Sequence, residues 1–302
     1  MVQLRKRTKK YYFFGIIIIF LICAAFAIFF IVKYKKLYEK LPTNNDLHTA
    51  WEAKDYRTVF DQTAKILERR PNDTAVRMLH GFAAYYLSSA QTSETDAHDF
   101  LDESIVSLRK ALYTVEQKDA PQLYYILGKA YYQKGYFYYD AALKYLNKVF
   151  DSGEKYPDLN KFRGMAFSYL GENQQAIEAF TNDLSDDADE FLLYALAKNY
   201  IETGNFEKAK MYLTEAAEKA KDVMLKLDCM AKLAEVFFTE GDIEKARAEY
   251  VSILAINEKY ADAYYGLGLI YEQAGDLIKA RAEWRKALKA NPLHAKTIEK
   301  LR

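Results

Sequence analysis

The residues that most often carry out chemistry are few and widely separated in this sequence. The histidines are His48, His80, His98 and His294, and their spacing matches no metal-binding pattern. The cysteines are Cys23 and Cys229, which is too few for a disulfide framework or a cysteine-built zinc site. His80 is expected to be an interior histidine of a helix, and Cys229 a small buried residue on an apolar helical face. These residues therefore predict no metal centre.

Larger catalytic patterns are missing as well. The sequence has no glycine-rich phosphate loop, no H-E-x-x-H motif and no G-x-S-x-G motif. The acidic run over 183–190 (DLSDDADE) lacks the glycine and the alternating ligands of a calcium loop, so we expect a solvated turn. We therefore expect no enzyme, no catalytic residue and no cofactor.

Charge is distributed unevenly along the 302 residues. Of 43 basic and 42 acidic residues, nine basic and one acidic lie in 1–40, which leaves 34 basic and 41 acidic residues in 41–302. A basic tip on an acidic body is typical of membrane targeting and does not favour nucleic-acid binding. With only 12 Gly and 5 Pro, the composition also argues against a turn-rich β fold and against disorder.

An apolar stretch near the start is long enough to cross a bilayer. Residues 11–32 carry no charge, and a helix of that length spans roughly 33 Å. Basic residues flank the stretch, and tyrosines mark both of its ends, where amphipathic rings favour the membrane interface. We expect a basic tip over 1–10, a transmembrane helix over 11–32 and a linker over 33–43.

Cleavage of this segment is the alternative to an uncleaved anchor. Ala25-Phe26-Ala27 has the small-x-small form of a signal-peptidase site, and Cys23 suggests a lipoprotein site. Either cut would leave an apolar stub on the mature chain, and Ile22 is bulky where a lipoprotein site needs a small residue. An uncleaved anchor is therefore favoured.

The orientation follows from the basic residues on each side of the span. Five precede it, and three follow it directly, or four with Lys40, so the N-terminus is expected in the cytoplasm. The body would then occupy the periplasm of a bacterium, attached to the inner membrane. In the alternative, the body faces the cytosol from an organelle membrane.

The rest of the chain repeats with a period of about 34 residues. Tyr264-Tyr265-Gly266-Leu267-Gly268-Leu269-Ile270-Tyr271 recurs as Tyr124-Tyr125-Ile126-Leu127-Gly128-Lys129-Ala130-Tyr131. A glycine follows each such phrase, at Gly135, Gly171, Gly204, Gly241 and Gly275, and from Gly171 on an alanine comes five residues later. Each glycine is expected to end a first helix with a positive φ, and each alanine to allow close packing of a second helix.

This pattern resembles the tetratricopeptide repeat (TPR) family. Residues 261–294 carry its eight marked positions as Tyr264, Leu267, Gly268, Tyr271, Ala280, Trp284, Ala287 and Pro292. The resemblance implies an all-α fold, a right-handed α-solenoid of about seven helix-turn-helix units over 44–294. The units are approximately 40–73, 74–120, 121–156, 157–189, 190–226, 227–260 and 261–294.

Three parts of the repeat region depart from a regular array. The first unit is degenerate. The second contains about eleven extra residues, among which Ser88–Glu94 are expected to form a polar loop. Residues 293–302 are expected to form a C-terminal capping helix, with Leu293, Ile298 and Leu301 facing inward.

The resemblance also implies that a partner binds in a concave groove lined by the first helix of each unit. The groove candidates are Met78, Phe82, Tyr85, Tyr86, Tyr125, Lys129, Tyr132, Lys161, Met165, Tyr169, Tyr194, Lys198, Phe238 and Tyr265. This mixture of aromatic residues, methionine and lysine suits a peptide with apolar anchors and some acidic residues. Any single tyrosine is as well explained by packing between helices.

The function predicted from these features is that of a single-pass membrane scaffold that binds a protein or peptide partner. The alternative is a cytosol-facing receptor or adaptor of an organelle membrane, of the import or fission type. The TPR domains that hold a C-terminal carboxylate use Asn and Lys at set groove positions, and that set is absent here. The sequence does not identify the partner.

Overall fold

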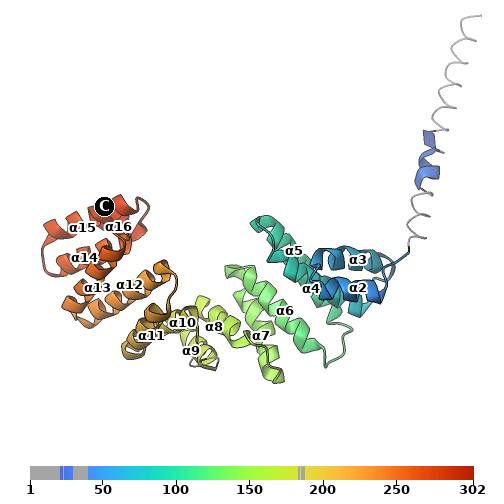
Figure 1. Ribbon diagram of the computed structural model, residues 1–302, viewed down its shortest axis with the longest axis horizontal. Helices are drawn as coiled ribbons and strands as arrows, with labels where there is room; N and C mark the ends of the chain where they lie inside the picture. Colours follow the sequence, from blue (N-terminus) through green and yellow to red (C-terminus); the bar gives the residue numbers. More distant parts are fainter. Residues whose placement is uncertain (1–20, 23, 30–39, 183, 185–187) are drawn as a thin grey trace, which may run out of the picture. The chain divides into compact units, whose positions relative to one another are not determined.

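The computed structural model describes residues 21, 22, 24–29, 40–182, 184 and 188–302. From residue 40 on, the described residues are helices joined by short turns, without a β-strand. The helices, which Figure 1 shows in chain order, are α2 (Asn44–Glu52), α3 (Tyr56–Arg69), α4 (Thr74–Ser88), α5 (Glu94–Ala111), α6 (Ala120–Gln133), η1 (Tyr136–Tyr138), α7 (Tyr139–Ser152), α8 (Leu159–Tyr169), α9 (Asn173–Asn182), α10 (Glu190–Glu202), α11 (Phe206–Lys219), α12 (Val223–Glu240), α13 (Ile243–Ile256), α14 (Ala261–Gln273), α15 (Leu277–Ala290) and α16 (Ala295–Leu301).

The chain divides into two compact units, one ending at Ala83 and the other beginning at Ala84, inside α4. In the first unit, Thr43 starts α2 with a reciprocal capping box with Asp46, and the Asp55 carboxylate caps α3. Val59 and Ile66 of α3 are completely buried. The first unit therefore has an apolar core of its own between α2, α3 and the start of α4.

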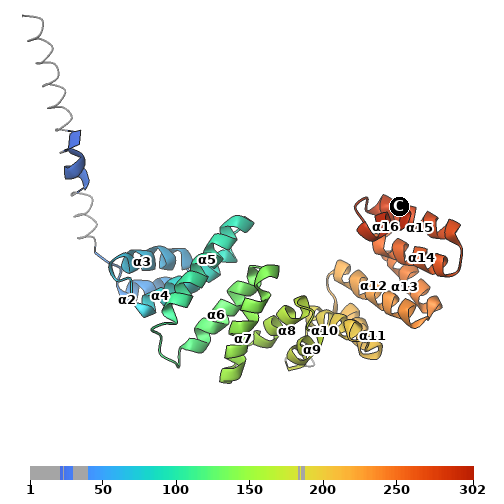
Figure 2. The ribbon, with the colours of Figure 1, turned by 180° about the vertical axis from the view of Figure 1, so that it is seen from behind.

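In the second unit, helices pair within each repeat and every pair packs against the next. The pairs are α6 with α7, α8 with α9, α10 with α11, α12 with α13 and α14 with α15, and they can be followed from behind in Figure 2. Contacts also join α7 to α8, α9 to α10, α11 to α12 and α13 to α14. Each repeat thus buries its apolar surface against its neighbours in sequence.

Glycine ends the first helix of the pairs from α6 to α14. Gly135, Gly171, Gly204, Gly241 and Gly275 all have a positive φ, between 74° and 89°, as the repeat pattern predicts. At Gly241 the left-handed conformation directs the backbone N–H to the carbonyls of Phe237 and Phe238, in the last turn of α12. The second helix can then begin two residues later and run back along the first.

Small residues let the two helices of a pair approach closely. A Cβ added to Gly268 would lie 2.1 Å from Trp284 Nε1, and one added to Gly128 would lie 2.5 Å from Leu146 Cγ. The alanines that the pattern marks on the second helices, Ala176, Ala209, Ala246 and Ala280, are completely buried. The small side chains at these positions therefore make the close packing of each pair possible.

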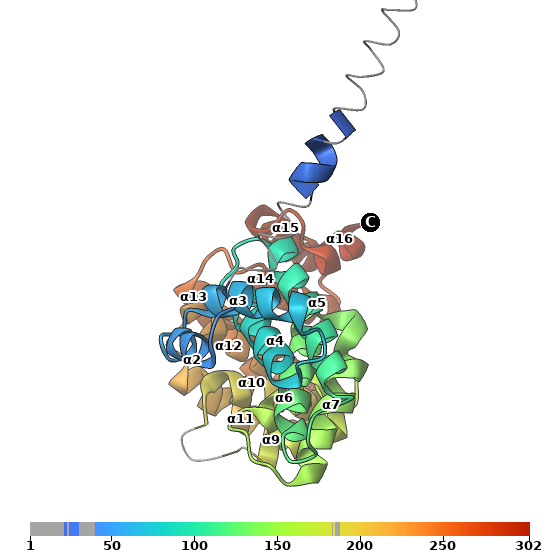
Figure 3. The ribbon, with the colours of Figure 1, turned by 90° about the vertical axis from the view of Figure 1, so that its right-hand side faces the viewer.

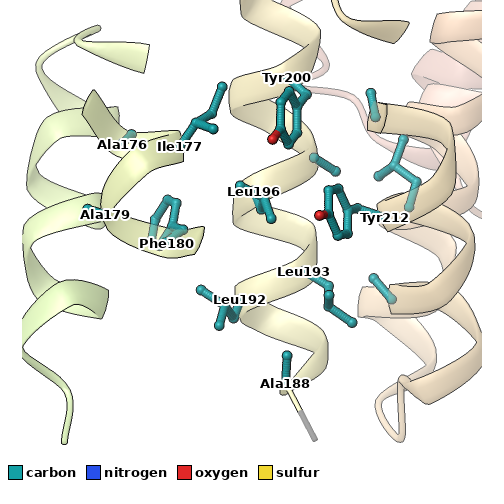
Figure 4. Close-up of a cluster of buried hydrophobic side chains, with 14 of the residues drawn as sticks. Ala176, Ile177, Ala179, Phe180, Ala188, Leu192, Leu193, Leu196, Tyr200 and Tyr212 are labelled. Atoms are coloured by element: carbon teal, nitrogen blue, oxygen red, sulfur yellow. The ribbon is translucent and has the colours of Figure 1, made fainter. Parts of the chain in front are cut away.

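The central apolar cluster lies on both sides of α10 (Figure 4). Leu192 points toward α9, where Phe180 is 1% exposed, and Leu193 points toward α11. Tyr200 of α10 stacks on Tyr212 of α11, with 5.7 Å between ring centroids and 10° between ring planes. This packing fixes α10 on two sides and leaves its third face for the site described below.

Two segments change the spacing of the repeats. The extra residues of the second repeat are mostly helical. The Ser93 hydroxyl oxygen accepts a hydrogen bond from Asp96 N–H and so caps the start of α5, which then runs for 18 residues. The connection between α4 and α5 is residues 89–93. Helix α12 begins at Val223, four residues before the unit boundary expected at 227, because Asp222 accepts a hydrogen bond from Met224 N–H at 3.0 Å.

Helix α16 covers the last repeat through polar residues rather than through the expected leucine. Leu293 is 84% exposed, so its inward assignment was wrong, whereas Ile298 and Leu301 are partly buried. His294 is buried instead and bonds Asp262 of α14 at 3.0 Å and Thr297 at 2.6 Å. These bonds join the residue before α16 to α14 and to α16 itself, and α14, α15 and α16 lie together in Figure 3.

The expected transmembrane helix over 11–32 falls mostly outside the described residues. Within the described part of the chain, no helix has both the length and the hydropathy needed to cross a bilayer. The basic tip over 1–10, most of the linker over 33–43, and four residues of the acidic run over 183–190 also lie outside it.

Candidate partner-binding pocket

One face of α10 carries a stripe of side chains that lines a recess, and two of them, Tyr194 and Ala195, also pack against the apolar core. Its members form two adjacent rows, within which residues are three or four positions apart, and they therefore share one face. They are Phe191, Tyr194, Ala195, Lys198, Asn199 and Glu202. Together with residues of α8 and α9 they line a pocket of about 540 Å³, which we call the α8–α10 pocket.

The walls of the α8–α10 pocket are largely apolar. Met165 from α8, Phe180 from α9 and Ala195 from α10 line it. Two aromatic side chains on its lining, Tyr169 and Phe191, are 56% and 57% exposed. The volume lies in the range of about 300–1,000 Å³ that is usual for binding sites. An apolar side chain of a partner would find both a recess and aromatic surface here.

Asn199 gives the pocket a buried polar group that the fold only partly satisfies. Its Nδ2 donates to Ala195 O at 2.8 Å and to Ser168 Oγ at 3.1 Å, which fixes the amide orientation because a carbonyl oxygen can only accept. Its Oδ1 is buried and has no donor among the described residues. A buried acceptor left unpaired costs about 1–3 kcal/mol of folding free energy. Other contacts of the fold must offset this cost at Asn199.

The charged residues of the pocket are Lys198 and Glu202, one turn apart on α10. The Lys198 ammonium lies 5.8 Å from the centroid of the Tyr194 ring. No ion pair joins either side chain to another described residue. Burial raises the pKa of Tyr194 to about 12, with Asp228 the largest charge contributing, so this phenol stays neutral at physiological pH.

A second group of predicted groove residues forms a packed cluster on α6 and α8, which we call the Lys129 cluster. The Lys129 ammonium lies 2.7 Å from Asp158 Oδ2, 4.7 Å from the Phe162 ring centroid and 4.9 Å from that of Tyr125. The Tyr125 hydroxyl donates to Asp158, and its ring stacks on Tyr156 at 4.1 Å. Lys129 is therefore neutralised and enclosed by its own chain.

Aromatic contacts connect the Lys129 cluster to the α8–α10 pocket. Tyr132 packs edge-on against Phe162 at 5.1 Å and lies 6.4 Å from Tyr169, which lines the pocket. Burial raises the pKa of Tyr125 and of Tyr132, and for Tyr125 the bond to Asp158 raises it further. These phenols act as neutral packing and hydrogen-bonding groups.

The other groove candidates differ in how much surface they offer. Phe82 and Tyr85 of α4 are buried, at 7% and 5% exposure, so their assignment to a groove surface was wrong. Both side chains pack inside the fold instead. Lys161 is paired with Asp189 at 3.0 Å. The remaining candidates are partly or largely exposed and lie outside the α8–α10 pocket: Met78, Tyr86, Phe238 and Tyr265.

His80 and Cys229 have structural roles in the described part of the chain. His80 is buried, stacks on Phe60 at 4.3 Å, and its Nδ1 lies 2.9 Å from Thr63 Oγ1. Cys229 is buried, and burial raises its pKa to about 12. Within the described ranges, no group of three His, Cys, Asp or Glu residues is placed to hold a metal.

Four of the pocket residues are predicted from the sequence, namely Met165, Tyr169, Tyr194 and Lys198, and the structure brings these together. The other lining residues were missed, and three of them, Phe191, Asn199 and Glu202, have a spacing from Tyr194 and Lys198 that places them on the same helical face. The family pattern marks fixed groove positions, and these three occupy others.

The helix pairs define an all-helical repeat protein, and the comparisons give the class of repeat. Residues 192–222 and 261–294 match models described as tetratricopeptide repeats, and residues 234–275 match a model described as a TPR repeat. The chain therefore contains TPR repeats. No curated protein matches the sequence.

Solved structures share the fold at low sequence identity. The C-terminal part of a TPR repeat-containing protein from Cytophaga hutchinsonii is 17% identical, with a TM-score of 0.61 over 85% of this chain and 98% of that chain. A MamA protein is 23% identical, with a TM-score of 0.50 over 60% of this chain and 96% of that chain. A MamA chain from Desulfovibrio magneticus RS-1 is 17% identical, with a TM-score of 0.50 over 59% of this chain and 98% of that chain.

Proposed function

We propose that this chain is a single-pass membrane-anchored TPR scaffold that holds a protein partner through the α8–α10 pocket. The observation that carries the proposal is the pocket itself, an apolar recess between three helices with exposed aromatic residues on its lining. Buried aromatic anchors that fill such recesses supply much of the affinity of protein interfaces. The TPR repeats support a role in binding proteins, and no catalytic activity is assigned.

Attachment to the membrane rests on the sequence of residues 11–32. Their 22 uncharged residues and the basic flanks are the features of an anchor. The orientation that we propose keeps the N-terminus in the cytoplasm and places the repeats in the periplasm at a bacterial inner membrane. The alternative is an adaptor whose repeats face the cytosol from an organelle membrane.

The pocket is tested by capture from the native membrane. A photoreactive phenylalanine analogue replaces Phe191 on the pocket, and in a matched control it replaces Tyr113, which is 85% exposed and outside the pocket. We expect a partner to be captured from position 191 and not from position 113. Equal capture from both positions, or none from position 191, would refute the proposed site.

The membrane anchor is tested separately. The intact chain should remain with membranes after carbonate washing, whereas a variant with three lysines in place of Ile17, Ile18 and Ile19 should be released, because charges at the centre of a span are costly. Protease digestion of the repeats in intact and in opened cells distinguishes the two orientations. Recovery of the unmodified chain in the carbonate supernatant would contradict the anchor.

A further inference from the structure

Lysines on two successive first helices are neutralised in the same way. Lys129 on α6 pairs with Asp158, the residue that precedes α8, at 2.7 Å. Lys161 on α8 pairs with Asp189, the residue that precedes α10, at 3.0 Å. In both cases the aspartate at the N-cap of the next first helix supplies the carboxylate. The two lysines differ in repeat position, because Lys129 follows the small residue Gly128 whereas Lys161 comes three residues before Gly164.

Lys198 on α10 stands at the repeat position of Lys129, which Met165 occupies on α8, and no described carboxylate forms an ion pair with it. It follows the small residue Ala197, as Lys129 follows Gly128, so the two lysines are equivalent in the repeat. Because α12 begins early, its N-cap aspartate is Asp222, which accepts from Met224 N–H. The first carboxylate within α12, on Asp228, accepts the Tyr260 hydroxyl hydrogen at 2.5 Å.

The consequence is a lysine at the α8–α10 pocket whose charge is not neutralised by a direct ion pair, although the Glu202 carboxylate lines the same pocket one turn away. Lys198 is exposed, and no described carboxylate forms an ion pair with its ammonium. The pocket wall beside it is apolar and partly aromatic. The chemical complement of this arrangement is a carboxylate next to an apolar side chain.

We infer that the α8–α10 pocket binds a peptide segment in which an aromatic or aliphatic side chain is adjacent to an Asp or Glu. The apolar side chain enters the recess between Met165, Phe180 and Ala195, and the carboxylate takes the place at Lys198 that Asp158 takes at Lys129. The inference rests on the proposed function, since it names the partner's chemistry at the same site.

Glu202 restricts where the acidic residue of the partner can lie. It lines the pocket one turn from Lys198, and it forms no ion pair with it in the structure. A carboxylate at this position repels a second one, so the acidic residue of the partner must lie on the Lys198 side. Removing the Glu202 charge should therefore favour an acidic peptide, whereas removing the Lys198 charge should disfavour it.

The test uses synthetic peptides and the full chain in detergent. One fluorescent peptide has a central Phe flanked by Asp on both sides, and its match has Asn in place of each Asp. We expect the Asp peptide to bind about 2- to 5-fold more tightly, the value of a partly exposed ion pair. Lys198→Gln should abolish this preference, Lys198→Arg should keep it and Glu202→Gln should increase it. A third peptide, with Ala in place of Phe, should bind more weakly than either.

Three outcomes would overturn the inference. They are equal binding of the Asp and Asn peptides, a preference that survives Lys198→Gln, and no binding of either peptide. Each is separable from failure of the proposed function, which is decided by capture of the native partner from position 191. Capture there that is unchanged by Lys198→Glu would keep the pocket as the partner site and reject the acidic partner.

Discussion

Lys129 Nζ lies 2.7 Å from Asp158 Oδ2, and this ion pair joins α6 to the start of α8. The same carboxylate accepts a hydrogen bond from Tyr125, and the Lys129 side chain is only 15% exposed. From sequence, Lys129 is a groove cation that would attract an acidic partner. In the structure its charge is already compensated within the chain, so its first role is to hold two repeats together.

Asp158→Ala is expected to destabilise the fold. It leaves the largely buried Lys129 ammonium without its carboxylate and the Tyr125 hydroxyl without its acceptor, at a cost of about 1–3 kcal/mol. Urea unfolding followed by circular dichroism measures the change. Lys161→Met is the control, because its pair with Asp189 is more exposed and should contribute about 0–1 kcal/mol. Equal losses in the two variants would contradict this ranking.

Aromatic residues of the Lys129 cluster and of the pocket should respond differently to truncation. Tyr132→Ala removes a half-buried ring that contacts Phe162 and Tyr139, and should lower the free energy of unfolding by about 2–4 kcal/mol. Phe191→Ala removes a ring that is 57% exposed and should change stability by less than about 0.5 kcal/mol. Partner capture, measured on the same variants with the photoreactive group at position 169, should fall for Phe191→Ala. A large loss of stability in Phe191→Ala would instead make that ring structural.

A side chain at position 268 of α14 should clash with Trp284 of α15, and a smaller residue at position 284 should relieve the clash. Gly268→Ala places a Cβ against the Trp284 ring and should cost about 1–3 kcal/mol through overpacking. The double variant with Trp284→Leu should show favourable coupling, since the smaller side chain leaves room for the new methyl group. Thermal unfolding of the four members of the cycle measures this coupling. Purely additive losses would show that the two positions do not meet.

Asp189 links the stability of α10 to pH. Its burial would raise the pKa, but the hydrogen bond from Leu192 N–H and the Lys161 ammonium outweigh it and hold the pKa below 3.8. The stabilisation by the carboxylate is therefore complete above pH 3.8 and is lost as the pH falls through the lowered value. Asp189→Asn should unfold more easily than the wild type at neutral pH, and the difference should narrow in acid. A difference that is independent of pH would exclude this linkage.

The helix pairs and their turns could be predicted from sequence because the repeat imposes local chemistry. The positive φ of Gly204 and the burial of Ala209 follow from their places in the repeat, and both are confirmed. The early start of α12 could not be predicted in this way. It depends on Asp222 capping Met224, a local hydrogen bond that competes with the average spacing of the repeats.

The candidate site was only partly predictable for a related reason. Tyr194 and Lys198 stand at positions that the family marks, whereas Asn199 matters because its neighbours leave Oδ1 without a donor among the described residues. Lys129 shows the opposite error, since its sequence position suggests a free charge and its partner Asp158 comes 29 residues later. Whether Lys129 or Lys198 has an ion pair depends on contacts with the next repeat. The sequence pattern within one repeat does not show these contacts.

The turn at Gly135 shows how such an array can diversify. Apart from the glycine and its two chain neighbours, no described residue has an atom within 4 Å of the position that a Cβ at Gly135 would take. The two residues that follow it, Tyr136 and Phe137, are 68% and 86% exposed. Gly128, on the helix α6 that precedes this turn, has Leu146 directly against it. Selection can thus lengthen a turn and give it new side chains while the contact between the paired helices is kept. New surface side chains and the packing that stabilises the repeat therefore evolve at different positions.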